Sequence, residues 1–242
     1  YVRAFLSAYY FSETGEFDFS QIARIDQFPH EKFFKEKVSS INEASKQWVP
    51  VQREINKDKK IRFFKTHSFL GNYQGNQFTT PETTLGAIYI VRDPRNVLSS
   101  LKNHYSFDDD NALKMIKDKT RSLMSNNGSH ASLTYISSWS ENYLSWLRNN
   151  QFRRLFIKYE DLISNKYETF RDIIVFTNTL MNKVEGVNKS KLQKAIETTN
   201  FDVLKKKEVS ETFNGSESSF KNWRKFHSEN KNLFFNLGPE NN

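Results

Sequence analysis

The stretch LGAIYIVRDPRN at residues 85–96 limits the fold of this chain more than any other segment. Its centre, residues 87–91, is a continuous apolar run rich in β-branched and aromatic side chains, which is typical of a strand covered on both faces. Asp93 and Pro94 break the run, and proline favours the first position of a helix because no N–H is needed there. The stretch therefore predicts a buried strand followed by a helix that extends to Tyr105.

Two other apolar runs are strand candidates, KIRFFKTH at 60–67 and RRLFIKYEDL at 153–162. Trp139 and Trp146 stand seven residues apart, on one face of a predicted helix, and this spacing favours packing in a core. Strands alternating with helices predict an α/β protein with a mainly parallel central sheet flanked by helices. The helical patterns cover residues 1–11, 95–105, 109–125, 131–149, 166–181, 189–199 and 228–238, while residues 12–60 are mixed and predict loops with one or two short helices.

Polar side chains with compatible chemistry stand at the ends of the three predicted strands. Lys65 and His67 end the first strand, Arg92 ends the second and Tyr159 ends the third. Ligands of such sheets bind beyond the carboxyl ends of the strands, so two cations, a histidine and a tyrosine would face one ligand. An anionic aromatic molecule such as a nucleotide fits this set. Each residue alone also has a plainer reading, such as a surface ion pair for Arg92.

Composition narrows the chemistry further. The formal net charge of +8 is compatible with a solvated basic surface or with a partner that carries phosphate or sulfate. The basic residues are spread along the chain, so a role in nucleic-acid binding rests on charge alone. The 242 residues include no cysteine, no apolar stretch of membrane-spanning length and no signal peptide, which favours a soluble, cytoplasmic protein. The five histidines lack the spacing of metal ligands, so no metal is expected.

Several blocks together resemble the sulfotransferases that use 3'-phosphoadenosine 5'-phosphosulfate (PAPS). They are KTH after an apolar strand, YIVRDPRNVLSSLKNHY, SSWSENYLSW, LFIKYEDL and TTNFDVLKKKE, with a weaker fit at NWRKF. Their order and spacing fit the cytosolic and bacterial sulfotransferase domain over nearly the whole chain. The resemblance implies a single domain over residues 1–242, a P-loop NTPase-like sulfotransferase fold, PAPS as the donor and 3'-phosphoadenosine 5'-phosphate (PAP) as a product.

The resemblance also implies roles for individual residues. His67 matches the general base that takes the proton from the acceptor hydroxyl, and Lys65 matches a lysine near the transferring sulfuryl group. Arg92 and Ser100 match the ligands of the 3'-phosphate of the nucleotide. This chemistry needs no metal, since a histidine with a pKa near neutrality accepts the proton and a cation stabilises the developing negative charge.

Four further positions match residues around the adenine. Tyr159 matches a tyrosine that contacts the base, Phe201 matches an aromatic residue packed on it, and Thr199 stands beside Phe201 in the same motif. Tyr1 aligns with the aromatic residue that closes the 5'-phosphosulfate loop of the family, so that loop is expected upstream of Tyr1. The Arg-Lys-Gly clamp of the family has no match near the C-terminus, where residues 216–218 are Ser-Glu-Ser.

Other functions remain open from the sequence. The first alternative is a protein of the same fold that binds the nucleotide without activity, and the second is a P-loop kinase of small molecules. No GxxxxGK[ST] phosphate loop and no GxGxxG is present, which disfavours the kinase. Residues 12–60 and 103–135 are expected to shape the acceptor pocket. Their composition does not distinguish a sugar, lipid, phenol or peptide acceptor, and the sequence does not set the oligomeric state.

Overall fold

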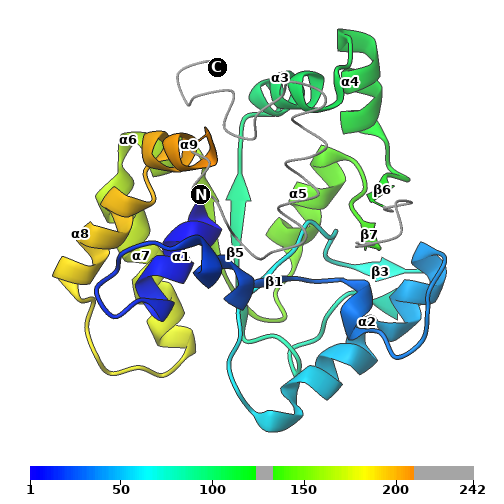
Figure 1. The fold of residues 1–242 in the computed structure, drawn as a ribbon. Helices are drawn as coiled ribbons and strands as arrows, with labels where there is room; N and C mark the ends of the chain where they lie inside the picture. Colours follow the sequence, from blue (N-terminus) through cyan, green and yellow to red (C-terminus); the bar gives the residue numbers. More distant parts are fainter. Residues whose placement is uncertain (124–132, 210–242) are drawn as a thin grey trace. The chain divides into compact units, whose positions relative to one another are not determined.

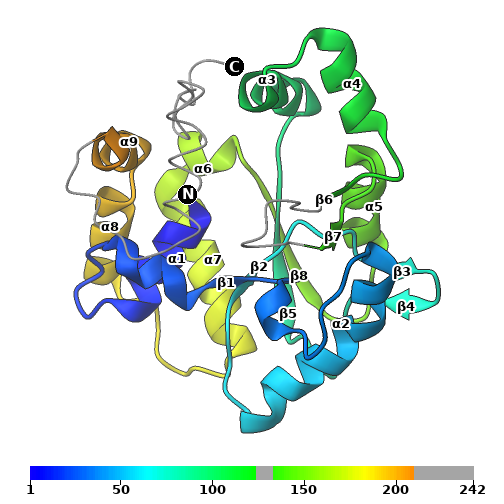
Figure 2. The same cartoon turned by 45° about the vertical axis from the view of Figure 1, so that its right-hand side comes forward.

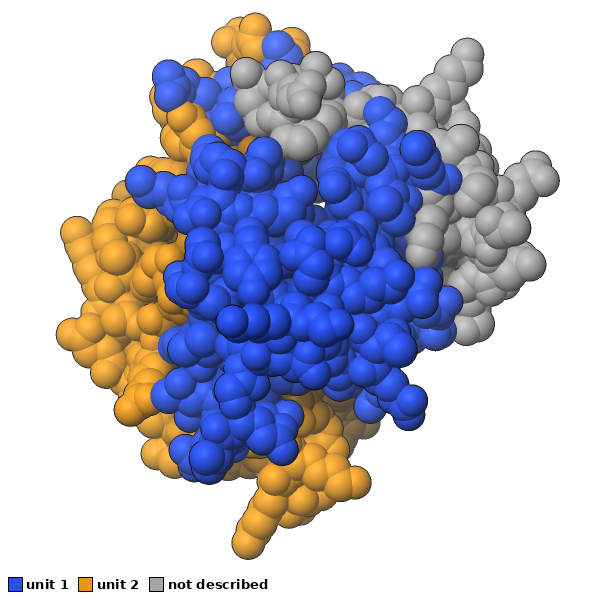
Figure 3. Space-filling model, turned by 90° about the vertical axis from the view of Figure 1, so that its left-hand side faces the viewer, with its two compact units in different colours: residues 1–26, 95–106, 158–242 blue, residues 27–94, 107–157 orange. Residues whose placement is uncertain are grey.

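The computed structural model describes residues 1–123 and 133–209, and these form two compact units (Figure 3). Unit 1 contains residues 1–26, 95–106 and the chain from residue 158 onward, whereas unit 2 contains residues 27–94 and 107–157. The prediction of one domain over residues 1–242 stays a prediction. The predicted helix at 228–238, the NWRKF block and residues 216–218 lie outside the described residues.

Unit 1 is helical in its described part. Its core forms where α1, α7 and α8 pack together (Figures 1 and 2). The rings of Phe5 on α1 and Phe170 on α7 have no exposed surface, and their centroids are 3.9 Å apart. Burial of two such rings stabilises the unit, because each removes a large apolar area from water. The helices are α1 (Val2–Phe11), the 3₁₀ helix η1 (Phe19–Arg24), α3 (Pro94–Tyr105), α6 (Asp161–Ser164), α7 (Lys166–Leu180), α8 (Lys189–Thr198) and α9 (Phe201–Val209).

Unit 2 has its own apolar core, built around α2. Ser40 caps this helix by accepting a hydrogen bond from the Glu43 amide, and Ile41, Ala44 and Trp48 share its buried face. Trp146, on α5, belongs to the same core, as the sequence predicts, and Trp139 stacks on Tyr143 with centroids 5.7 Å apart. The helices of the unit are η2 (Glu31–Phe33), α2 (Ile41–Ile55), η3 (Asn56–Asp58), α4 (Asp109–Lys117) and α5 (Trp139–Arg148).

The strands form four pairs in the described residues. The strand predicted in residues 85–91 is β5 (Gly86–Val91), but it is not buried as predicted, because its residues are half-buried and Ile90 has 41% of its surface exposed. It lies side by side with β8 (Arg153–Lys158) in a parallel pair (Figure 2). β1 (Asp26–Gln27) pairs in parallel with β2 (Phe64–Lys65). Two antiparallel pairs complete the set, β3 (Asn72–Tyr73) with β4 (Asn76–Gln77) and β6 (Ser122–Leu123) with β7 (Thr134–Tyr135). The α/β class with parallel pairing is confirmed.

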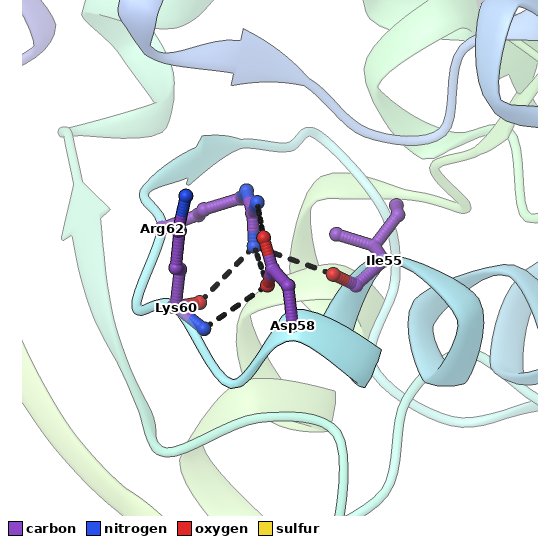
Figure 4. A network of polar contacts seen from close by, with 4 residues as sticks. All are labelled: Ile55, Asp58, Lys60 and Arg62. Carbon is purple, nitrogen blue, oxygen red and sulfur yellow. Dashed lines mark hydrogen bonds and ion pairs between the residues drawn. The ribbon is translucent and has the colours of Figure 1, made fainter.

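The first predicted strand is shorter than expected, and side-chain hydrogen bonds before it explain why. Arg62 binds the Asp58 carboxylate with both terminal nitrogens and also donates to the carbonyl oxygens of Ile55 and Lys60 (Figure 4). The Lys60 amide donates to the same carboxylate at 3.0 Å. The guanidinium lowers the pKa of Asp58, so the pair stays charged at neutral pH. This network holds residues 59–62 in an irregular conformation after η3, and the strand begins only at Phe64.

Helix ends also differ from the predicted ones. The helix predicted over 109–125 ends at Lys117, because the Asp118 carboxylate accepts from the Thr120 amide at 2.8 Å and from its hydroxyl at 2.7 Å. The helix predicted over 131–149 begins only at Trp139, where Ser138 caps it. The ends of α1, α3, α7 and α8 agree with the predicted ones to within one or two residues. The helix α9 was not predicted, and the prediction of only short helices in residues 12–60 is wrong, because α2 has 15 residues. No helix in the described ranges is long and apolar enough to span a membrane.

Candidate functional site

The segment after β2 carries Lys65 and His67, and α5 fixes its backbone. Three α5 side chains on one helix face bind the backbone of three residues in this segment, His67, Ser68 and Leu70. The Asn142 amide donates to the His67 carbonyl at 3.2 Å, and the Trp146 indole donates to the Ser68 carbonyl at 2.9 Å. The Leu70 amide donates to the Ser145 hydroxyl at 2.9 Å. His67 therefore sits on a backbone that is anchored at several points to a helix 75 residues further along the chain.

The Asn142 side chain makes hydrogen bonds to three different segments around His67. Its side-chain nitrogen donates to the His67 carbonyl and, at 2.8 Å, to the Ile136 carbonyl. Its side-chain oxygen accepts from the Tyr89 hydroxyl on β5 at 3.0 Å. Burial, with a smaller contribution from Tyr143, raises the pKa of Tyr89 to about 12, so the hydroxyl is protonated and can donate. One amide thus connects β5, α5, the segment before α5 and the segment that bears His67.

The sequence analysis did not identify Asn142 or Ser145 as site residues. The only signal was the i, i+3, i+4 spacing of Asn142, Ser145 and Trp146, which places them on one helix face. The same spacing occurs in many core helices, so it does not reveal that this face binds backbone groups beside a histidine.

The electrostatic surroundings of His67 favour its neutral form. Nearby protein atoms reduce the hydration of the ring, and the positive charges of Lys65 and Arg121 act in the same direction, so the pKa of His67 lies well below its usual 6.5. The side chain still has exposed surface, which limits the loss of hydration. The charges of Lys65 and Arg121 lower the pKa of His67 even where its ring is hydrated. His67 is therefore a neutral imidazole at pH 7 and can accept a proton.

The second predicted strand end lies at the β5–α3 junction. Arg92 directly follows β5, is half-buried and belongs to unit 2. Pro94 is the first residue of α3, as predicted. Ser100 stands on α3 with an exposed side chain and belongs to unit 1. A shared phosphate between Arg92 and Ser100 stays a prediction.

Unit 1 contains all four residues predicted to surround the adenine. Tyr1 precedes α1 and packs edge-on against Phe170 with centroids 5.3 Å apart. Burial, and less strongly Tyr159, raise the pKa of Tyr1, so the two tyrosines are neighbours. Phe201 is the half-buried first residue of α9. Thr199 is fully buried, and its hydroxyl donates to the Ala195 carbonyl at 2.6 Å. This favours a role in positioning Phe201 rather than direct contact with the nucleotide.

The protein has three features that are typical of a group-transfer enzyme. It has an α/β fold with parallel strand pairs, and a helix that begins with proline shortly after an arginine at a strand end. It also has a neutral histidine two residues from a lysine. Within residues 1–123 and 133–209, no three acidic or histidine side chains are grouped as around a metal ion. The family model of the sulfotransferase domain matches residues 10–236. The chain therefore belongs to the sulfotransferase domain family, as the sequence motifs predict. No curated protein matches it.

Proposed function

We propose that this protein transfers a sulfuryl group from PAPS to a hydroxyl or amine of a small-molecule or glycan acceptor, with His67 as the general base. Membership of the sulfotransferase domain family supports sulfotransferase activity in general. The observation that carries the finer proposal is the state of His67. Reduced hydration and the charges of Lys65 and Arg121 lower its pKa, and α5 side chains hold its backbone segment in place.

The reaction assigns a task to each of the two residues of the KTH block. The His67 imidazole accepts the proton of the acceptor hydroxyl while the acceptor oxygen attacks sulfur. The bond between sulfur and the phosphate oxygen breaks, and PAP leaves with the electron pair. Negative charge grows on the sulfuryl oxygens and on the bridging oxygen during this step. The Lys65 ammonium lies within electrostatic range of His67, and its charge would stabilise those oxygens.

Separate residues would bind the phosphate and the adenine of the donor nucleotide. Arg92 would bind the 3'-phosphate through its guanidinium, and Ser100 would add a hydroxyl donor. Tyr1, Tyr159 and Phe201 offer aromatic faces suited to an adenine. The proximity of Tyr1 to Tyr159 within unit 1 supports this assignment. Thr199 would act through the start of α9, because its hydroxyl already donates to α8.

The pH dependence of sulfuryl transfer tests the role of His67. In the full-length protein, we expect His67→Asn to lower turnover roughly 10²- to 10⁴-fold and to leave PAP affinity unchanged, because only the proton acceptor is lost. Lys65→Ala should also slow turnover but keep the acid limb of kcat/KM. That limb should move to higher pH, since removal of a cation that disfavours the imidazolium raises the pKa of His67.

Three outcomes would contradict the proposal in different ways. Near-normal transfer by His67→Asn, with the same acid limb, would make another residue the base. An acid limb that stays in place in Lys65→Ala would mean that this lysine does not act on His67. PAP binding without any transfer from PAPS would instead favour the nucleotide-binding protein without activity.

A further inference from the structure

An open cavity of about 600 Å³ lies in unit 2 between the end of α4 and β6. It falls within the segment 103–135 that the sequence predicts to shape the acceptor pocket. Its wall combines an apolar part with a polar part, and two of its side chains are cationic. The lining residues are Phe107, Asn111, Lys114, Met115, Asp118, Thr120, Arg121, Ser122 and Leu123.

The Arg121 side chain in this wall has unused hydrogen-bonding capacity. Its Nε atom has no contact with solvent and no hydrogen-bond partner, and its guanidinium makes no hydrogen bond or ion pair with the residues that the structure describes. The nearby Asp118 carboxylate already accepts two hydrogen bonds from Thr120. A guanidinium donor buried without an acceptor is costly, and a carboxylate or sulfate oxygen is the partner it binds best.

Backbone hydrogen bonds connect Arg121 to the predicted base. The Arg121 carbonyl accepts from the amides of Ile136 at 2.9 Å and Ser137 at 3.0 Å. The Ile136 carbonyl accepts in turn from the Asn142 nitrogen that also binds the His67 carbonyl. Next to them, the Phe69 amide donates to the Tyr135 carbonyl at 2.8 Å. Arg121 and His67 are thus held on neighbouring segments of the same unit, and the charge of Arg121 reaches His67.

We propose that this cavity is the acceptor subsite and that Arg121 binds an anionic group of the acceptor, a carboxylate or a sulfate ester. The proposal rests on the sulfotransferase function proposed above. Binding of the anion would bring a hydroxyl of the same molecule towards His67. The apolar side chains of Phe107, Met115 and Leu123 would contact its carbon skeleton. The preferred acceptors are therefore acidic, such as a hydroxy-carboxylate or a uronic acid sugar, rather than neutral alcohols.

Matched pairs of acceptors test this inference by calorimetry on the full-length protein. The first pair is 4-hydroxybenzoate and 4-hydroxybenzamide, and the second is the methyl glycosides of glucuronic acid and glucose. We expect the anion of at least one pair to bind about 10- to 100-fold more tightly than its neutral partner, as loss of a charge-assisted hydrogen bond implies. Arg121→Gln should remove this preference. Because the side chain binds no described residue, the substitution should leave the fold intact.

Lys117→Gln is the matched control. Lys117 is the last residue of α4 and, like Arg121, carries one positive charge, but it does not line the cavity. This variant should keep the preference for anions. Equal affinity within both pairs, including no detectable binding, would overturn the inference, and so would an unchanged preference in Arg121→Gln.

Two further measurements separate this inference from the proposed function. If Arg121→Gln weakens PAP binding, the residue belongs to the nucleotide site and the acceptor assignment fails. If anions bind through Arg121 but PAPS supplies no sulfuryl group to any of them, the proposed function fails and the anion site stands. If both members of each pair are sulfated with the same kcat/KM, the function stands and the acidic-acceptor inference fails.

Discussion

Replacing Asn142 with alanine removes the amide that connects His67 to the rest of unit 2. The substitution deletes three hydrogen bonds at once: those to the carbonyls of His67 and Ile136, and the one from the Tyr89 hydroxyl. Asn142 has 9% of its surface exposed, so water reaches its side chain poorly. We therefore expect a loss of both stability and turnover.

The magnitude follows from the number of partners. A typical hydrogen bond contributes about 1 kcal/mol net, so three suggest a loss of about 3 kcal/mol in the free energy of unfolding of unit 2. Part of this is recovered at the exposed His67, where water can bind the carbonyl. Tyr89→Phe deletes only one of the bonds and should cost about 1 kcal/mol. The double variant should cost no more than Asn142→Ala alone, because the Tyr89 hydroxyl no longer has its partner.

Urea denaturation followed by tryptophan fluorescence measures these differences, since Trp48, Trp139 and Trp146 all lie in unit 2. In parallel, turnover with PAPS should fall about 10- to 100-fold, because small displacements of a reacting group are costly. PAP affinity should stay within about two-fold of the original, since Asn142 is not among the residues proposed to bind the nucleotide.

Asn165→Ala is the matched control, because this exposed asparagine makes no capping hydrogen bond. It should change stability by less than about 0.5 kcal/mol. Two results would refute the reasoning. One is an Asn142→Ala protein with the original stability and turnover. The other is a double-variant cost equal to the sum of the single costs, which would mean that Asn142 and Tyr89 do not act as a pair.

Two predictions concern the donor nucleotide. The protein should bind PAP more tightly than adenosine 5'-phosphate, and Arg92→Ala should remove about 1.5–3 kcal/mol of that preference. Equal calorimetric affinities for the two nucleotides would argue against a phosphate site at Arg92. Phe201→Ala should weaken PAP binding with little change in the melting temperature, because the half-buried ring would lose its stacking on adenine. Normal PAP affinity with a lower melting temperature would show that Phe201 only supports the core.

Local patterns were sufficient for several elements. The apolar run of β5 and the proline that opens α3 are properties of adjacent residues, so the sequence placed both correctly. The same holds for α7 and α8, whose apolar spacing is regular. The family was also readable from the motifs, because their order and spacing are preserved in the chain itself.

Other boundaries depend on side chains that interrupt a pattern. The Asp118 turn ends α4 early, and the Asp58–Arg62 pair shortens the strand before Lys65. In both cases a carboxylate binds groups two to four residues away, and this competes with the continued helix or strand. Helix and strand propensities averaged over several residues do not include such a hydrogen bond. The predicted helix and strand therefore extended too far.

The sequence by itself determined that Lys65, His67 and Arg92 stand at strand ends, since this follows from the chain order of apolar runs and polar residues. Only the tertiary structure decided what surrounds them. Asn142 lies 75 residues from His67, and the Arg121 carbonyl accepts from the amides of Ile136 and Ser137 in the segment before α5. Such contacts arise when distant segments pack together, and the pKa of His67 depends on them because charge and hydration act through space rather than along the chain.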